Sequence, residues 1–95
     1  MVATDRLSAF DHALPNGIPD RGKVLTQLSI FWFSQTHTFQ ENHLVSGMVP
    51  DLPAALRDHR DELAGRFMIV RRAKRIDFEC VVRGYLAGSA WKEYQ

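Results

Sequence analysis

The clearest pattern of hydrophobic positions in this sequence lies between Asp20 and about Phe39. Apolar residues recur there at steps of three and four, which is the period of one face of an α-helix. Asp20 is a residue type that often caps a helix N-terminus, so we predict a helix from Asp20 to about Phe39. Its aromatic cluster, Phe31-Trp32-Phe33, is expected to belong to the core. The apolar positions of the predicted face are Val24, Leu25, Leu28, Phe31 and Trp32.

Shorter apolar runs predict strands. The two strongest are Arg66–Arg72 and Ile76–Tyr85, and weaker ones are Met1–Thr4 and part of Asn42–Val49.

Turn-forming residues dominate the intervals between these elements. Asp5–Asp20 contains three turn signals and is expected to be a loop, with a hairpin turn at Asn16-Gly17. Asp51 is expected to cap a short helix that runs through Leu56 or beyond.

Composition narrows the class of protein. Ninety-five residues fit one small domain, and a hydrophobic content of 45% excludes a disordered chain. The longest apolar runs are far too short to cross a bilayer, so no membrane association is expected. A formal net charge of +1 provides no overall field to attract nucleic acid.

The number and spacing of cysteine and histidine residues bear on disulfides, metal sites and catalytic groups. The only cysteine, Cys80, excludes an intramolecular disulfide, and the neighbouring valines favour a buried, inert thiol. The N-terminus shows no secretory signal, and together these features favour a cytoplasmic protein. The four histidines lack metal-ligand spacing, and no catalytic nucleophile with a partner base is indicated.

The segment Glu79–Ser89 combines residue types that suit an anion. Arg83 offers a rigid fork of donors, and Ser89 can donate its hydroxyl or cap a following helix. Gly84 and Gly88 allow the backbone to approach a ligand closely. The alternative interpretation is a strand, a turn and a helix cap without a ligand.

The basic connector Arg71–Arg75 joins the two strongest predicted strands. Its composition fits a nucleic-acid patch, a solvated turn or a loop facing a ligand that bears phosphate. Because the rest of the chain is near neutral, a nucleic-acid role is the weakest of the three.

Two stretches of the chain resemble one enzyme family. The first runs from Val2 to Phe33 and includes the motif Asp5-Arg6-Leu7-Ser8-Ala9-Phe10-Asp11, and the second runs from Phe78 to Tyr94. Both are similar to SAICAR synthetase (phosphoribosylaminoimidazole-succinocarboxamide synthase), and the resemblance covers essentially the whole chain. It is least clear from about His37 to Gly65.

The resemblance implies an ATP-dependent ligase of de novo purine biosynthesis. Such an enzyme joins L-aspartate to carboxyaminoimidazole ribonucleotide and gives SAICAR, ADP and phosphate, with Mg²⁺ present. The resemblance also implies an α+β fold, a mostly antiparallel β-sheet with one long helix packed on it, which forms part of a kinase-like N-terminal lobe that binds ATP. Its partners would therefore be these small molecules.

The resemblance assigns roles to several residues. Arg83 and Ser89 match positions that hold the phosphate of the nucleotide substrate. Arg72, Ala73 and Lys74 match a hinge whose backbone faces the adenine of ATP. Glu79 is assigned to the nucleotide pocket, with a structural ion pair as the alternative. Characteristic positions without an assigned role are Asp5, Ser8, Asp11 and Lys23.

The family pattern extends beyond this chain in both directions. A glycine- and lysine-bearing hairpin over the ATP phosphates is expected before Met1, and the magnesium ligands are expected after Gln95. Residues 1–95 are therefore interpreted as a partial N-terminal domain that is inactive alone, with an exposed strand edge that favours self-association. The alternatives are a small phosphate- or nucleotide-binding module and an inert, oligomerising fragment.

Overall fold

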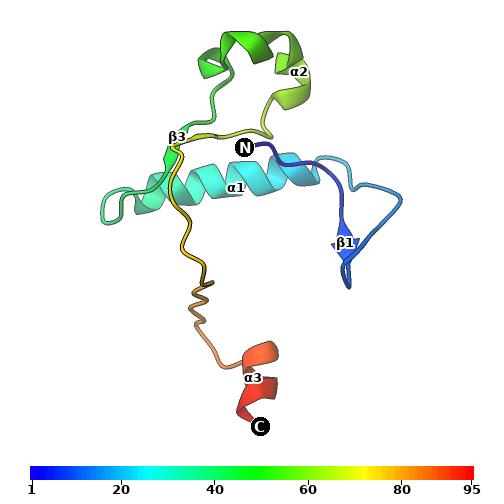
Figure 1. Cartoon of the computed structure of the whole chain (residues 1–95), viewed down its shortest axis with the longest axis vertical. Helices are drawn as coiled ribbons and strands as arrows, with labels where there is room; N and C mark the ends of the chain where they lie inside the picture. The colour runs from blue at the N-terminus through cyan, green and yellow to red at the C-terminus, as the bar shows by residue number, and fades with distance from the viewer.

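The computed structural model describes all residues from Met1 to Gln95 and shows an α+β chain built around one long helix (Figure 1). This confirms the predicted fold class. No helix combines the length and the hydropathy that crossing a bilayer requires. The elements in chain order are β1 (Ser8–Ala9), β2 (His12–Ala13), α1 (Arg21–Thr36), β3 (Leu44–Ser46), the 3₁₀-helices η1 (Val49–Asp51) and η2 (Ala54–His59), α2 (Arg60–Leu63), β4 (Ile69–Val70) and α3 (Ser89–Tyr94).

The strands form two separate antiparallel pairs, β1 with β2 and β3 with β4. In the second pair Leu44 lies opposite Val70, and an irregularity follows before Ser46 meets Ile69. The strand predicted at Arg66–Arg72 is therefore present but shorter, because pairing is limited to the length of β3.

The N-terminal segment lies beside the chain just before β4. Val2 and Phe67 form an isolated antiparallel bridge, and the backbone N–H of Ala3 donates to the carbonyl of Arg66 at 2.8 Å. Met1 and Met68 exchange two hydrogen bonds at 2.8 and 2.9 Å. The strand predicted at Met1–Thr4 is thus a single bridge flanked by these bonds.

The first hairpin turns at Phe10-Asp11, so the turn predicted at Asn16-Gly17 is wrong. Phe10 and Asp11 have φ values of 49° and 62°, and two successive left-handed residues match the twist of a two-residue hairpin. Gly17 serves a different purpose, because a Cβ atom there would lie 2.9 Å from the carbonyl oxygen of Asp5.

The strand predicted at Ile76–Tyr85 is absent. The chain runs irregularly from β4 to α3 and leads away from α1 (Figure 1). No other strand lies beside this segment, and an extended segment without a partner has no ladder of hydrogen bonds. For the same reason Cys80 is exposed, which corrects the expectation of a buried thiol.

Helix α1 begins where the sequence predicts and ends three residues before Phe39. Gly22 and Thr26 are its buried positions, and Phe33 is half-buried on the same side. Phe31 and Trp32 are 51% and 60% exposed, so the prediction that the aromatic cluster belongs to the core is wrong for these two rings. Only one face of α1 is covered by the rest of the chain.

Leu52 and Phe67 are the buried hydrophobic side chains, each 3% exposed. Leu52 follows η1, and Phe67 precedes β4 and pairs with Val2. Asp51 does not cap a helix as predicted, because its carboxylate accepts a hydrogen bond from the hydroxyl of Ser46 and Pro53 occupies the N-cap of η2.

Candidate functional site

The structure brings Arg83 and Ser89 together, as the anion-site prediction requires. A guanidinium nitrogen (Nη2) of Arg83 donates to Oγ of Ser89 at 3.0 Å. Gly88 turns the chain into α3 with a φ of 62°, a value that favours glycine. Both side chains are exposed, and the other donors of Arg83 make no bond within the chain. A fork with free donors beside a hydroxyl is able to bind a phosphate or carboxylate.

The hinge predicted at Arg72–Lys74 follows β4 as an exposed, irregular segment. The last backbone bond of the sheet edge runs from the N–H of Arg71 to the carbonyl of His43 at 2.8 Å. The N–H groups of Arg72, Ala73 and Lys74 make no backbone hydrogen bond, so they are free to pair with a ligand.

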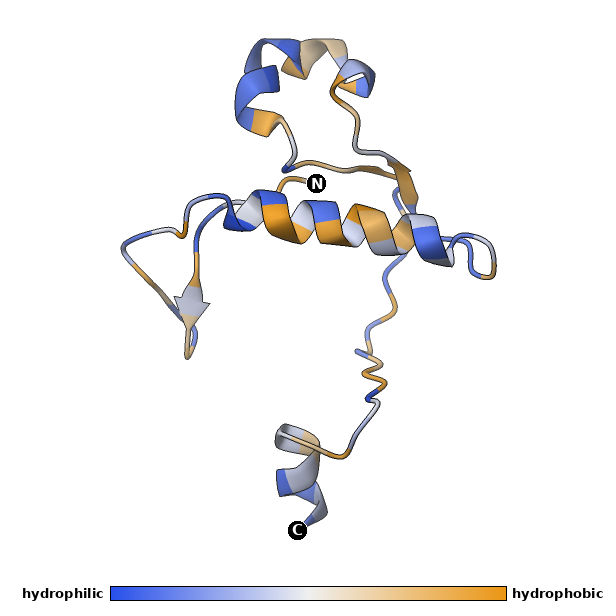
Figure 2. Cartoon of the chain, turned by 180° about the vertical axis from the view of Figure 1, so that it is seen from behind, coloured by the Kyte–Doolittle hydropathy of each residue, from blue (hydrophilic) through white to orange (hydrophobic).

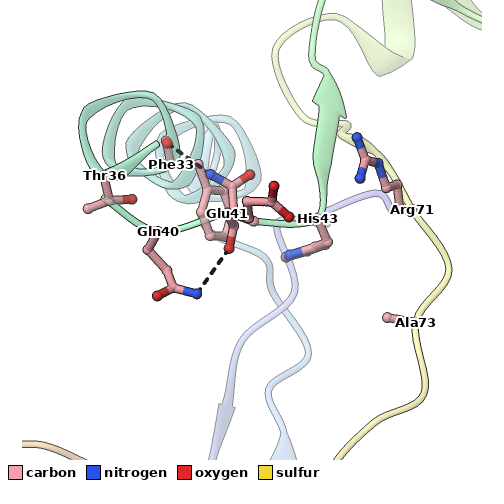
Figure 3. Close-up of a pocket in the computed structure, with 8 residues that line it drawn as sticks. Phe33, Thr36, Gln40, Glu41, His43, Arg71 and Ala73 are labelled. Carbon is pink, nitrogen blue, oxygen red and sulfur yellow. Dashed lines mark hydrogen bonds between the residues drawn. The ribbon is translucent and has the colours of Figure 1, made fainter. Parts of the chain in front are cut away.

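An open pocket of about 540 Å³ lies beside this hinge (Figure 3). Its walls come from the C-terminal end of α1, the following loop and the chain after β4 (Figure 3). His43 packs edge-on against Phe33 with ring centroids 5.1 Å apart. The lining residues are Phe33, Thr36, Gln40, Glu41, Asn42, His43, Arg71 and Ala73.

Glu79 does not line the pocket beside the hinge. It borders a separate depression formed by Arg75 to Glu79, in which Arg75 and Asp77 form an exposed ion pair at 3.9 Å. The structure therefore places Ala73 and Glu79 at different depressions, although the sequence assigns both to one nucleotide pocket.

The carboxylate of Asp5 accepts several hydrogen bonds near the N-terminus of α1. Its Oδ1 accepts hydrogen bonds from the N–H of Gly22 and from Nη1 of Arg66, both at 2.9 Å. Its Oδ2 accepts bonds from the N–H of Asp20 at 3.2 Å and from Nη2 of Arg66 at 3.3 Å. Asp5 thereby ties α1, the N-terminal segment and the chain before β4 together.

Asp5, rather than Asp20, caps α1. Asp20 occupies the N-cap position with a left-handed backbone (φ 62°) and makes no side-chain capping bond, so the predicted capping role is wrong. The Asp20 carboxylate instead pairs with Nζ of Lys23 at 2.8 Å. A carboxylate that accepts from free N–H groups at a helix N-terminus also interacts favourably with the helix dipole.

The surroundings of Asp5 lower its pKa. Hydrogen bonding from Arg66 is the largest cause, and the bond from the N–H of Gly22 is the next. Both favour the charged carboxylate, because a negative oxygen is the stronger acceptor.

Because the pKa of Asp5 is lowered on folding, the stability of the folded chain depends on pH in the acid range. The stabilising contribution of Asp5 is fully present above the ordinary carboxyl pKa of about 3.9 and is lost as pH falls through the lower pKa of the folded state. We expect Asp5→Asn to lower the melting temperature at pH 7 and to flatten its dependence on pH below about 4. Thermal unfolding from pH 2 to pH 7 measures both, and an unchanged acid limb would contradict the assignment. Asp58→Asn, at an exposed carboxylate, is the control.

No group of three or more His, Cys, Asp or Glu side chains is placed so that it could hold a metal ion.

Comparison with known proteins identifies the family of this chain. The fold matches that of SAICAR-synthase from Saccharomyces cerevisiae, solved in complex with SAICAR, with a TM-score of 0.81 and 44% identity. The match covers 98% of this chain and 33% of the yeast chain. The SAICAR synthetase family model matches residues 1–95, and the chain belongs to that family.

Curated relatives agree with this assignment. Phosphoribosylaminoimidazole-succinocarboxamide synthases of Thermodesulfovibrio yellowstonii and Geotalea uraniireducens are 54% and 52% identical over all 95 residues. The chain spans about a third (32%) of the length of each.

Proposed function

We propose that this chain contributes the nucleotide-phosphate site of an ATP-dependent ligase of purine biosynthesis. The reaction joins L-aspartate to carboxyaminoimidazole ribonucleotide and gives SAICAR, ADP and phosphate. Family membership over the whole chain supports this proposal, as does the yeast relative solved with SAICAR. Residues 1–95 then form part of an N-terminal lobe of the cytoplasmic enzyme.

The Arg83–Ser89 pair is the observation that carries the proposal. In this enzyme the 5′-phosphate of the ribonucleotide accepts from the free donors of Arg83 and from the hydroxyl of Ser89. A charged, forked donor suits a dianionic group, and the Gly88 turn keeps the approach free of side chains. Fixing the phosphate orients the distant carboxylate that reacts.

The hinge would bind the second nucleotide. The free N–H groups from Arg72 to Lys74 support hydrogen bonding to the adenine of ATP. Glu79 is proposed as a further contact of the nucleotide pocket. Magnesium would supply charge compensation for the phosphates when bound, and its ligands are proposed to lie outside residues 1–95.

A sparse core supports the further proposal that the 95 residues alone do not catalyse the ligation. Only four residues are buried, and the segment that carries Arg83 stands apart from α1 (Figure 1). A phosphate site can exist on such a chain, whereas ligation requires three reactants held in fixed positions.

The phosphate site is tested by binding of a ribonucleoside monophosphate to the chain. We expect saturable binding that Arg83→Ala weakens about tenfold, because a hydrogen bond to a charged group is worth about 1.5 kcal/mol or more. Isothermal titration calorimetry measures the affinity. Arg57→Ala removes another exposed arginine, on η2, and is expected to bind like the unsubstituted chain. Equal weakening by both variants would indicate nonspecific charge attraction and overturn the proposal.

A further inference from the structure

The segment between β4 and α3 has no hydrogen-bonded partner within this chain. No backbone N–H or carbonyl group of residues 72–87 takes part in a backbone hydrogen bond. Hydrophobic side chains of the segment also lie in solvent, since Phe78 and Val82 are 81% and 97% exposed. An extended apolar stretch with unused donors and acceptors is a template for pairing with another polypeptide.

The side chains of residues 76–83 alternate in polarity, as they do in a strand with one buried face. Hydrophobic and hydrophilic positions follow one another along the segment that leads to α3 (Figure 2). In an extended conformation one face is apolar and the other is mostly charged. The first face carries Ile76, Phe78, Cys80 and Val82, and the second carries Asp77, Glu79, Val81 and Arg83.

The order of the charges favours an antiparallel pair of identical strands. When two copies run antiparallel about Cys80, Asp77 of each copy lies opposite Arg83 of the other. On the apolar face, Phe78 of each copy lies opposite Val82 of the other. Opposite charges, and an aromatic ring facing a β-branched side chain, both stabilise a two-stranded ribbon. A parallel pair in register would instead set Asp77 against Asp77 and Arg83 against Arg83, which is unfavourable.

The neighbouring antiparallel registers lose one of these contacts. A pair centred on Glu79 would place that carboxylate against its own copy. A pair centred on Val81 would place Phe78 opposite Gly84, so the aromatic ring would have no side chain across from it. The sequence of the segment therefore fits a second copy of itself best in the register centred on Cys80.

We infer that residues 76–84 pair with the same residues of a second copy of this chain, as antiparallel strands centred on Cys80. The exposed ion pair of Asp77 with Arg75, at 3.9 Å, competes only weakly, because such surface pairs contribute little. A dimer of this kind is separate from the proposed ligase function, and sedimentation without nucleotide detects it whether or not Arg83 binds phosphate.

Complementary charge reversals test the pairing. Sedimentation equilibrium is expected to show a monomer–dimer equilibrium for the unsubstituted chain. Asp77→Arg and Arg83→Asp each place like charges opposite one another at both ends of the ribbon, so each is expected to weaken the dimer by about tenfold or more. A mixture of the two variants restores opposite charges at both ends and is expected to form a heterodimer. A chain that is monomeric at every concentration, or a mixture that does not associate, would overturn the inference.

Glu79→Arg is the matched control, because it reverses a charge on the same face at a position that lies opposite Val81. It is expected to change the dissociation constant by less than about threefold. Weakening equal to that of Asp77→Arg would indicate an effect of net charge and would contradict the pairing. All three substituted positions are exposed and lie outside the helices and strands, so circular dichroism of each variant is expected to match that of the unsubstituted chain.

Cys80 provides a second readout, of the register. In the inferred dimer the two Cys80 residues are directly opposite, with Cα atoms about 4.5–5.5 Å apart, which a disulfide can span. Diamide takes two electrons and two protons from such a pair of thiols, so it is expected to cross-link the unsubstituted chain into a species of twice the mass on a non-reducing gel. Asp77→Arg retains Cys80 and is expected to cross-link more slowly by about tenfold. Equal rates for both chains would indicate random collision and refute the pairing.

Discussion

Replacing Phe67 with alanine is expected to lower the free energy of unfolding of this chain by about 3–5 kcal/mol. Phe67 is 3% exposed and is one of the two buried hydrophobic side chains, so its removal leaves a cavity that few other groups can fill. It also pairs with Val2 and thereby fixes the N-terminal segment. Denaturant unfolding followed by circular dichroism measures the loss.

Phe78→Ala is the matched control for this prediction. Phe78 is 81% exposed, so the same deletion there removes little buried surface and should change stability by less than about 0.5 kcal/mol. Phe67→Leu keeps most of the buried volume and is expected to cost about 1.5 kcal/mol or less. If the two alanine variants are equally stable, Phe67 is not part of the core. If Phe67→Ala is fully unfolded, Phe67→Leu replaces it in the comparison: its loss of stability is expected to exceed that of Phe78→Ala.

Gly22→Ala is expected to destabilise the chain by about 2–3 kcal/mol, although alanine is the better helix former. Propensity favours the substitution by about 0.5–1 kcal/mol. A Cβ atom at Gly22, however, would clash with the carbonyl of Ala3, which is held in place because the N–H of Ala3 bonds to Arg66. The cost of this clash is therefore expected to exceed the gain in helix propensity. Moving Gly22 away from Ala3 would also weaken the hydrogen bond from the N–H of Gly22 to Asp5.

Gly84→Ala separates this clash from the general effect of replacing glycine. A Cβ atom at Gly84 would meet nothing within 4 Å, so the substitution should change stability by less than about 0.5 kcal/mol. Chemical denaturation of both variants measures the difference. A Gly22→Ala chain as stable as Gly84→Ala would show that the N-terminal segment does not pack on α1 as described.

Elements with strong local patterns could be predicted from the sequence. Helix α1 begins at the expected residue because its apolar period is local, and β3 and β4 lie within two predicted strands. The segment Ile76–Tyr85 has an equally strong pattern but no partner strand in this chain. Strand formation requires hydrogen bonds to a second segment, which a local pattern does not describe.

The Arg83–Ser89 pair and the hydrogen bonds around Asp5 also differ in how far apart their residues lie in the sequence. Arg83 and Ser89 are six residues apart around a glycine turn, so their proximity follows from the local sequence. Asp5 receives hydrogen bonds from partners 15 to 61 residues away. No signal near Asp5 predicts the bond to Arg66, and capping propensity alone assigned the cap to Asp20.

The sequence by itself determined the family, the α+β class and the position of α1. The tertiary structure alone decided that Asp5 caps α1, that the hairpin turns at Phe10-Asp11 and that Phe31 and Trp32 of α1 remain exposed. The physical reason is the range of the interactions. Periodicity and turns depend on neighbouring residues, whereas capping at a distance and burial depend on which distant segments meet.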